Sequence, residues 1–463
     1  MNTLTTTPWA PRSAKRKAPQ EPLERFTRLE ALPACWQWKT EGDAAGPKSW
    51  VLIHHEVNAA TALHWARQNV GMVWLCDFQN AKQLLVALQK RLEPRKPQHG
   101  VKPTEFDSPE ASSQAFHVQR LHRSEHLKIL SKLLIPIQGD YTIGLHRAPL
   151  VHDVLAAVWG QPLKAEVKPT SSPVLTAPTV DAPAAAPMLE DTPLTLVSLK
   201  ELLGYIGAHE WHKKGLPIPA LSTAVSSSQN ARKPPEEAPR IYPHYGVFSP
   251  VRGEYLNLVK TAPLPRALEN HSVAQDVGVG TGVLSAILLS RGVKRIIATD
   301  TQSRAIECAQ DNFSRLGLSE RVQVLQTSLF ADELTPLVVC NPPWLPGKAR
   351  SPMERAIFDP ESSMLKGFLN GLRSHLSPQG EGWLIMSDLA ERLGLRAPGE
   401  LLGWIESAGL EVVGQLKAQA VHPKSTDTSD AFYQARQGET TSLWRLQARS
   451  TSSSHESSPT QAT

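Results

Sequence analysis

The chain has 463 residues, 41% of them hydrophobic, and a formal net charge of +5. This length allows two or three domains, and the mild basic excess permits a polyanionic partner without requiring one. No run of 18 apolar residues occurs and the four cysteines have no paired spacing, so we expect no membrane span, disulfide framework or cysteine zinc site. A protein of the reducing cytoplasm is the expectation.

Two patterned regions alternate with segments rich in proline, alanine and serine. Such segments lack apolar periodicity and are typical of linkers and tails. The predicted divisions are a disordered basic tail (1–25), a first α/β domain without a glycine-rich loop (26–162), a linker (163–195), a helical segment with a second linker (196–240), a larger α/β domain (241–449) and a disordered tail (450–463).

The first α/β domain shows apolar runs and capping residues. Residues 50–54 and 72–76 have the composition of buried strands. Asn58 and Asp77 each precede a helical pattern, and their side chains can cap its first turn. The segment 141–145, which follows the turn "QGD", is predicted as a further strand.

A basic, histidine-containing segment lies near the middle of this domain. His122 and His126 are four residues apart, a spacing that can bind a metal on a helix. No third ligand is evident and Arg120, Arg123 and Lys128 surround them, so we expect no metal. The favoured interpretation is a solvated basic helix face, and contact with RNA is the second.

The second domain begins with a glycine-rich turn between a strand and a helix. Gly278, Gly280 and Gly282 follow the apolar run that starts at residue 273 and precede an apolar helix. Glycines here let a ligand approach the backbone and expose the amides of the helix N-terminus. Twenty residues after Gly280 the next strand ends at Asp300, whose carboxylate can accept both hydroxyls of a ribose.

The spacing in the turn favours S-adenosylmethionine (SAM) over a dinucleotide. A dinucleotide fold has Gly-x-Gly-x-x-Gly, but Val283 occupies the third glycine position of that pattern. The turn instead reads Asp-x-Gly-x-Gly-x-Gly from Asp276. An acidic residue before the glycines suits the ammonium of a methionine moiety, so Asp276 is predicted to contact it directly or through water.

The fourth strand of this domain, "LVVC", ends in Asn341-Pro342-Pro343-Trp344. Ligands bind at the carboxyl ends of strands in such sheets. The side-chain oxygen of Asn341 and the carbonyl of Pro342 can hold both hydrogens of a planar NH₂ group, so that its lone pair faces a methyl donor. The prolines fix the loop, and Trp344 offers a flat face for a planar substrate.

The region 241–449 resembles the class I methyltransferases of the "methyltransferase small domain" group. The resemblance rests on the glycine turn, on Asp300 and on the Asn-Pro-Pro-aromatic motif, where tyrosine or phenylalanine is commoner than tryptophan. It implies a Rossmann-like seven-stranded sheet. It also implies that the end of the third strand, with Ser328 and Leu329, lies near the adenine of the cofactor. Ser328 stands where many of these enzymes have an acidic residue.

The resemblance implies a SAM-dependent N-methyltransferase, and the group includes enzymes with different acceptors. A nucleobase in RNA, with rRNA favoured, is the first prediction. Residues 77–92 support it, because they are similar to part of the degenerate N-terminal half of rRNA guanine methyltransferases. A protein glutamine of the release-factor type is the alternative. A cofactor-binding protein without catalysis is a third and remote interpretation.

Overall fold

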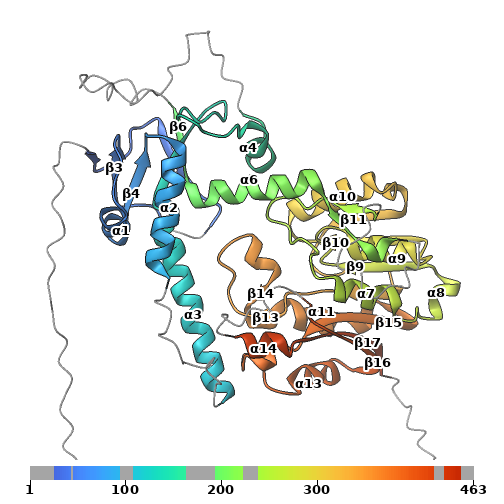
Figure 1. Cartoon of the computed structure of the whole chain (residues 1–463). Coiled ribbons are helices and arrows are strands. Elements are labelled where there is room, and N and C mark those ends of the chain that lie inside the picture. Colours follow the sequence, from blue (N-terminus) through green and yellow to red (C-terminus); the bar gives the residue numbers. More distant parts are fainter. Residues whose placement is uncertain are drawn as a thin grey trace, which may run out of the picture.

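The computed structural model describes residues 26–42, 45–93, 108–162, 193–222, 238–421 and 432–449. These residues form two α/β domains, which are joined by the helix α6 (Figure 1). The tails predicted over 1–25 and 450–463, and most of the linker predicted over 163–195, lie outside the described residues. Within the described ranges, no helix combines the length and the apolar composition needed to cross a bilayer.

The first domain is built on a six-stranded sheet of order β1-β3-β4-β5-β6-β2. Strands β3, β4 and β5 are parallel, whereas β6 is antiparallel to β5. Its elements are β1 (Phe26–Leu29), β2 (Trp36–Lys39), β3 (Ser49–Ile53), α1 (Ala59–Arg67), β4 (Val70–Trp74), α2 (Phe78–Leu92), α3 (Pro109–Leu130), β5 (Leu133–Gln138), α4 (His152–Trp159), β6 (Leu194–Ser198) and α6 (Leu199–Lys214).

Both predicted helix caps are confirmed. The Asn58 side chain accepts hydrogen bonds from two backbone amides at the start of α1, and Asp77 does the same at the start of α2. The strand predicted over 141–145 is wrong, because that segment has no ladder partner and runs as an irregular connection to α4.

The division placed after residue 162 also differs from the structure. Strand β6 lies between β5 and β2 in the first sheet, and the side chains of Leu199, Leu202 and Tyr205 on α6 are buried in the core of the first domain. Residues 194–214 therefore complete the first domain rather than forming a separate helical segment. Because β6 is an internal strand of the first sheet, this domain includes residues on both sides of the segment predicted as a linker.

The second domain contains a seven-stranded sheet of order β11-β10-β9-β12-β15-β17-β16, in which β17 is antiparallel to both its neighbours. This confirms the predicted seven-stranded α/β domain. The sheet elements and main helices are α7 (Gly253–Thr261), α8 (Ala267–Asn270), β9 (Val273–Val277), α9 (Val283–Ser290), β10 (Arg295–Asp300), α10 (Ser303–Arg315), β11 (Val322–Gln326), β12 (Thr335–Cys340), α11 (Ser363–His375), β15 (Leu376–Ser387), α12 (Leu389–Arg392), α13 (Glu400–Ser407), β16 (Leu410–Gln419), α14 (Tyr433–Gln437) and β17 (Thr440–Ala448).

Short strands and 3₁₀ turns complete this domain. They are β7 (Leu216–Pro217), η2 (Pro219–Leu221), β8 (Arg240–Ile241), η3 (Ser319–Arg321), β13 (Leu345–Pro346), η4 (Met353–Ala356), β14 (Phe358–Asp359) and η5 (Pro360–Ser362). The central strands β9 and β12 are buried at every residue, as expected for parallel strands covered by helices on both faces. Their carboxyl ends therefore lie side by side.

Helix α3 connects the two domains physically. Its carboxyl end leads into β5 of the first sheet, and Figure 1 shows the helix running from there toward α14 of the second domain. Phe116, in the amino-terminal half of α3, is buried in a cluster with Leu345, Leu389, Leu393 and Phe432 of the second domain. Helix α3 of the first domain is thus packed directly against the second domain.

Candidate active site

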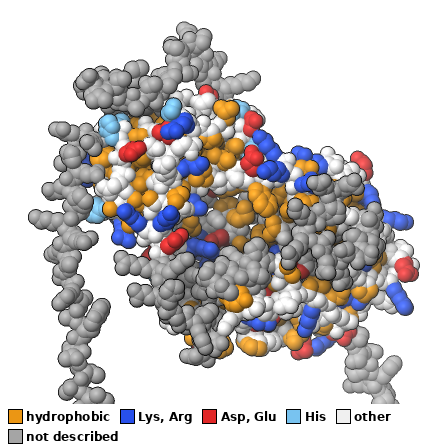
Figure 2. Space-filling view, viewed as in Figure 1, with side chains coloured by type: hydrophobic (Ala, Val, Ile, Leu, Met, Phe, Trp, Pro, Cys, Tyr) orange, Lys and Arg blue, Asp and Glu red, His pale blue; other side chains and the backbone are white. Residues whose placement is uncertain are grey.

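A cavity of about 1000 Å³ lies at the carboxyl ends of β9, β10 and β12. Figure 2 shows a hollow at the junction of the two domains on the face in view. The walls of the cavity are the glycine turn, the ends of the strands, the segment after Asn341 and helix α3. Its lining includes Gly278, Gly280, Asp300, Ser328, Leu329, Asn341, Pro342, Pro343 and Trp344, so most of the predicted site residues meet here.

The glycine turn has a backbone that other residues would not adopt. Gly278, Gly280 and Gly282 have φ angles of +77°, +53° and +80°. A Cβ on Gly282 would lie 2.6 Å from the Phe313 ring, and one on Gly278 would lie 2.9 Å from the Met364 methyl group. At Gly278 and Gly282, glycine is therefore favoured both by the left-handed conformation and by the side chains that pack against the turn.

Asp300 stands at the end of β10 and faces the cavity. Its carboxylate accepts hydrogen bonds from the backbone amides of Gly280, at 3.2 Å, and Gln302, at 2.9 Å. Burial raises the pKa of Asp300, while the backbone amides act in the opposite direction. The acid thus links the glycine turn to the second strand and presents acceptor oxygens to the cavity.

Asp276 does not take the position that the sequence predicted. It is fully buried below the turn and does not belong to the cavity lining. Its Oδ2 accepts hydrogen bonds from the Ser285 amide, at 3.0 Å, and the Ser285 hydroxyl, at 2.6 Å. Burial raises the pKa of Asp276 to about 7. The carboxyl group supports the first turn of α9 instead of facing a ligand.

The end of the third strand forms another part of the wall. Thr327, Ser328 and Leu329 line the cavity. Leu329 has a φ of +58°, and the Thr299 hydroxyl donates a hydrogen bond to its carbonyl oxygen. This bond holds the loop in a conformation that a non-glycine residue rarely adopts.

The motif at 341–344 carries a hydrogen bond that the sequence did not indicate. The Trp344 Nε1–H donates to Asn341 Oδ1 at 2.9 Å, so the oxygen expected to hold a substrate is engaged by the neighbouring indole. The Arg252 guanidinium lies over the indole at 4.6 Å from its centroid, and the Tyr255 ring meets it edge-on. These contacts fix the tryptophan and cover part of its face.

Sequence reasoning missed the cavity residues contributed from outside the expected site. Helix α3 supplies Gln119, Arg120, Arg123, Ser124 and Leu127, and the segment after β13 supplies Arg350 and Arg355. More than 200 residues of chain separate α3 from that segment. The sequence feature that could have revealed the contribution of α3 is the basic composition around residues 117–128. Contact with RNA was the second interpretation of that segment.

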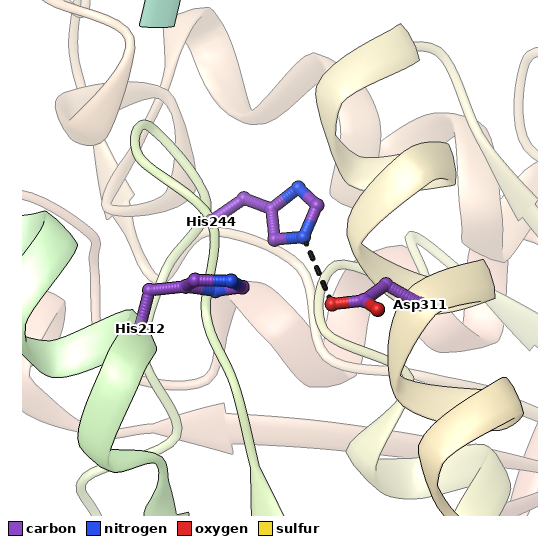
Figure 3. A group of neighbouring side chains, drawn as sticks. All are labelled: His212, His244 and Asp311. Carbon is purple, nitrogen blue, oxygen red and sulfur yellow. Dashed lines mark hydrogen bonds and ion pairs between the residues drawn. The ribbon is translucent and has the colours of Figure 1, made fainter. Parts of the chain in front are cut away.

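A group of polar side chains couples α6 to the second domain (Figure 3). His244 Nε2 lies 3.3 Å from Asp311 Oδ2, and the rings of His212 and His244 are 4.9 Å apart. These three residues lie close enough to share a metal ion, and His122 and His126 are not among them. Arg315 already donates to both Asp311 oxygens, so the negative charge is offset by a cation. We interpret the group as a polar contact between domains.

Comparisons with known proteins find similarity to methyltransferases. Residues 240–391 match the family described as "Methyltransferase small domain". A tRNA1(Val) (adenine(37)-N6)-methyltransferase of Parabacteroides distasonis is 31% identical over 120 residues, which cover 24% of this chain and 50% of the relative. A release factor glutamine methyltransferase of Cereibacter sphaeroides is 26% identical over 162 residues, which cover 32% of this chain and 56% of the relative.

A solved structure of ribosomal protein L11 methylase from Lactobacillus delbrueckii subsp. bulgaricus also matches, with 18% identity and a TM-score of 0.27 over 38% of this chain and 70% of that chain. The chain spans about half the length of the two curated relatives named above. The matched region contains the glycine turn, Asp300 and the motif at 341–344, which meet in one cavity. Residues 240–391 of the second domain, which include this site, thus match the methyltransferase small domain family.

Proposed function

We propose that this protein is a SAM-dependent N-methyltransferase that acts on the planar NH₂ group of a nucleobase in RNA, with rRNA as the favoured acceptor. The observation that carries the proposal is the position of residues 341–344 at the carboxyl end of β12, in the same cavity as the glycine turn and Asp300. The family of the second domain and its methyltransferase relatives support the reaction class. The four cysteines, which have no paired spacing in the sequence, fit a reducing cytoplasm.

The residues present fit the proposed cofactor. Backbone at Gly278 and Gly280 borders the cavity without side chains, and Asp300 offers acceptor oxygens suited to ribose hydroxyls. Ser328 and Leu329 border the place proposed for the adenine. When bound, SAM supplies an electrophilic methyl group. Asp276 is assigned a supporting role beneath the turn, because its carboxyl group is buried and bonded to Ser285.

The chain's own residues would orient the acceptor nitrogen. A planar NH₂ group has a delocalised lone pair, so catalysis depends on holding it in the reactive geometry. Asn341 Oδ1 and the Pro342 carbonyl can accept its two hydrogens. The Trp344 indole N–H already donates to Asn341 Oδ1. An amide oxygen has two lone pairs, so the acceptor nitrogen can donate to the lone pair that the indole leaves open.

Methylation of a protein glutamine is the second candidate. The similarity to a release factor glutamine methyltransferase favours it, and a glutamine side chain ends in the same planar amide. A SAM-binding protein without catalysis is the third. Asn341 and Pro342 both line the cavity, and this arrangement favours a catalytic role.

The acceptor can be identified by labelled methyl transfer. Purified protein and radiolabelled SAM are added to a cell extract, and the product is treated with RNase or with protease. We expect the label to be released by RNase. Label that resists RNase and is released by protease would replace the RNA proposal with the protein alternative.

The role of Asn341 is tested separately. Asn341→Ala should lower the rate of transfer by about 100-fold or more, because positioning is lost, while SAM binding measured by calorimetry is retained. Unchanged turnover by this variant would refute the assignment of the motif.

A further inference from the structure

We propose that helix α3 of the first domain and the segment 348–355 form a phosphate-binding wall that holds the backbone of a single-stranded nucleic acid beside the acceptor base. This proposal rests on the proposed function and names a binding site for its substrate class. It assigns the first domain a direct part in substrate binding through Arg123 of α3, which acts together with Arg350 and Arg355 of the second domain.

The position of α3 is fixed by packing against the second domain. Phe116 is buried in the shared apolar cluster, and Arg120 lies with its guanidinium 3.7 Å from the centroid of the Phe358 ring. Arg120 also donates to the Lys348 carbonyl at 2.8 Å, and Arg350 donates to the Arg120 carbonyl at 3.3 Å. The helix and the segment 348–355 are therefore bonded to each other in both directions.

Two glycines of the second domain show how closely helix α3 packs against that domain. A Cβ on Gly347 would lie 2.7 Å from the Arg120 guanidinium, and a Cβ on Gly394 would lie 2.0 Å from the carbonyl oxygen of Pro109. Gly347 follows the motif at 341–344 by three residues. The wall formed by α3 thus begins directly beside the residues proposed to hold the acceptor.

The charge of the cavity is strongly positive. Its lining contains seven arginines and three carboxylates, which leaves an excess of four positive charges. The arginines are Arg120, Arg123, Arg252, Arg304, Arg350, Arg355 and Arg436, and the acids are Glu41, Asp300 and Glu354. A site for a single SAM molecule does not require such an excess, because SAM itself carries positive charge.

Several of these arginines are engaged by carboxylates and serve the structure. Arg120 pairs with Glu354 at 3.5 Å, Arg304 pairs with Glu41 at 2.9 Å, and Arg252 pairs with Glu254 and Glu439. In the part of the chain that the structure describes, Arg123, Arg350 and Arg355 are exposed and form no ion pair. Arg123 comes from α3 and the other two from the segment 348–355, so both elements of the wall contribute cations to the cavity lining.

Phosphodiester groups fit this arrangement. A guanidinium binds phosphate through parallel hydrogen bonds, and repeated negative charges along a backbone match cations that are spread around an opening. Gln119 and Ser124 of α3 add neutral hydrogen-bonding groups to the same wall. A base extruded from a single strand could then enter the cavity while its flanking phosphates stay at the rim.

The test is binding of a fluorescein-labelled, mixed-sequence 12-nucleotide RNA to the full chain, measured by fluorescence anisotropy at several salt concentrations. The variants are Arg123→Gln, Arg350→Gln and the double substitution. Lys128→Gln is the matched control, because Lys128 is an exposed cation on the same helix outside the cavity lining. Melting curves check that each variant is folded, and SAM binding is measured on the same preparations.

We expect each arginine substitution to weaken RNA binding by about tenfold, and Lys128→Gln to weaken it by less than about twofold. The salt dependence should flatten by about 0.7 per arginine in the logarithmic slope, as for phosphate contacts to single strands. DNA of the same sequence should bind through the same arginines if the phosphates alone are recognised. A neutral peptide nucleic acid should not compete.

Two results would overturn the proposal. One is equal RNA binding by the wild type and the double variant. The other is a wild-type protein that binds SAM but no RNA, which would remove the phosphate wall and direct attention to a protein acceptor. A protein that binds RNA through these arginines but no SAM would refute the proposed methyltransferase while the phosphate wall would stand.

Discussion

Trp344 differs from the commoner phenylalanine or tyrosine at its position through its indole N–H. That group donates to Asn341 Oδ1, while the ring is held by Arg252 and Tyr255. A phenyl ring could keep the apolar contacts but could not donate this bond. The tryptophan therefore takes up one of the two lone pairs of the Asn341 oxygen and weakens it as an acceptor for the substrate.

Replacing Trp344 by phenylalanine should release that oxygen. We expect Trp344→Phe to lower the KM for the acceptor by up to about tenfold, the equivalent of one hydrogen bond, with little change in kcat and in SAM affinity. Steady-state kinetics with the identified acceptor measure both parameters. An increase in KM would mean that stacking on the indole contributes more to binding than the displaced bond costs.

At this scale the sequence predicted which residues meet but not how they bond. The sequence predicted that residues 341–344 follow the end of a strand. The carboxyl ends of parallel strands lie at the same edge of a sheet, so this position also brings the residues to the cavity. The bond within the motif depends on the rotamer of Trp344, which is set by Arg252 and Tyr255 from a separate segment. No local pattern contains that information.

Among the elements, the first turn of α9 shows how a buried strand supports a loop. Asp276 on β9 accepts from the amide and the hydroxyl of Ser285, so a residue of the strand caps the following helix across the turn. A ligand-binding role was predicted for Asp276 because an acidic residue before the glycines suits an ammonium. Strand β9 is buried on both faces, so alternation along it could not reveal which way the carboxyl group points.

The buried carboxyl group of Asp276 should give a measurable pH dependence of stability. Its pKa of about 7 in the folded state lies above the usual value of 3.8, because burial disfavours the charge. Between pH 4 and 7 the unfolded chain releases this proton while the folded chain keeps it, so this group makes the protein less stable as the pH rises through that window. Above about pH 7 the penalty is constant.

Asp276→Asn should remove this contribution. Urea unfolding at pH 5 and pH 8 should show the free energy of unfolding of the variant improving relative to wild type at the higher pH. Asp332→Asn, which alters an exposed carboxylate, serves as the control. Parallel pH profiles for wild type and Asp276→Asn would show that burial does not perturb this group.

For the whole molecule, the docking of α3 unites the two domains around one cavity. The sequence predicted two α/β domains and the seven-stranded sheet, since periodicity and turn residues are local. It did not predict the docking, because the apolar residue that anchors α3, Phe116, stands in a segment dominated by basic and polar residues. Contacts between segments that are distant in the sequence depend on how their surfaces fit together. Gly394 is an example, because only a residue without a side chain leaves room there for the start of α3.

Gly394→Ala should disturb the docking. A methyl group there would meet the Pro109 carbonyl at 2.0 Å and displace the start of α3. We expect kcat/KM for the acceptor to fall by about tenfold to 100-fold, with SAM affinity unchanged, because only the substrate wall moves. Methyl-transfer kinetics and calorimetry measure the two effects.

Gly399→Ala is the matched control for this substitution. Gly399 has a φ of +79°, close to the +66° of Gly394, but a Cβ there meets no atom within 4 Å. Both variants carry the same kind of backbone cost, roughly 1 kcal/mol, and only one of them contains the steric conflict. Equal activity of the two variants would contradict a role for α3 docking.

The position of β6 between β5 and the edge strand β2 affects how the chain can fold during its synthesis. Strand β6 joins β5 to β2 in the first sheet, yet it is encoded after residue 193, beyond the segment predicted as a linker. While the ribosome is still translating residues 163–192, β2 has no neighbour in that sheet, so the first domain cannot close until β6 has left the exit tunnel. Nascent chains arrested before residue 194 should therefore be sensitive to protease, whereas chains arrested well beyond Lys214 should be protected over residues 49–93 and 108–138.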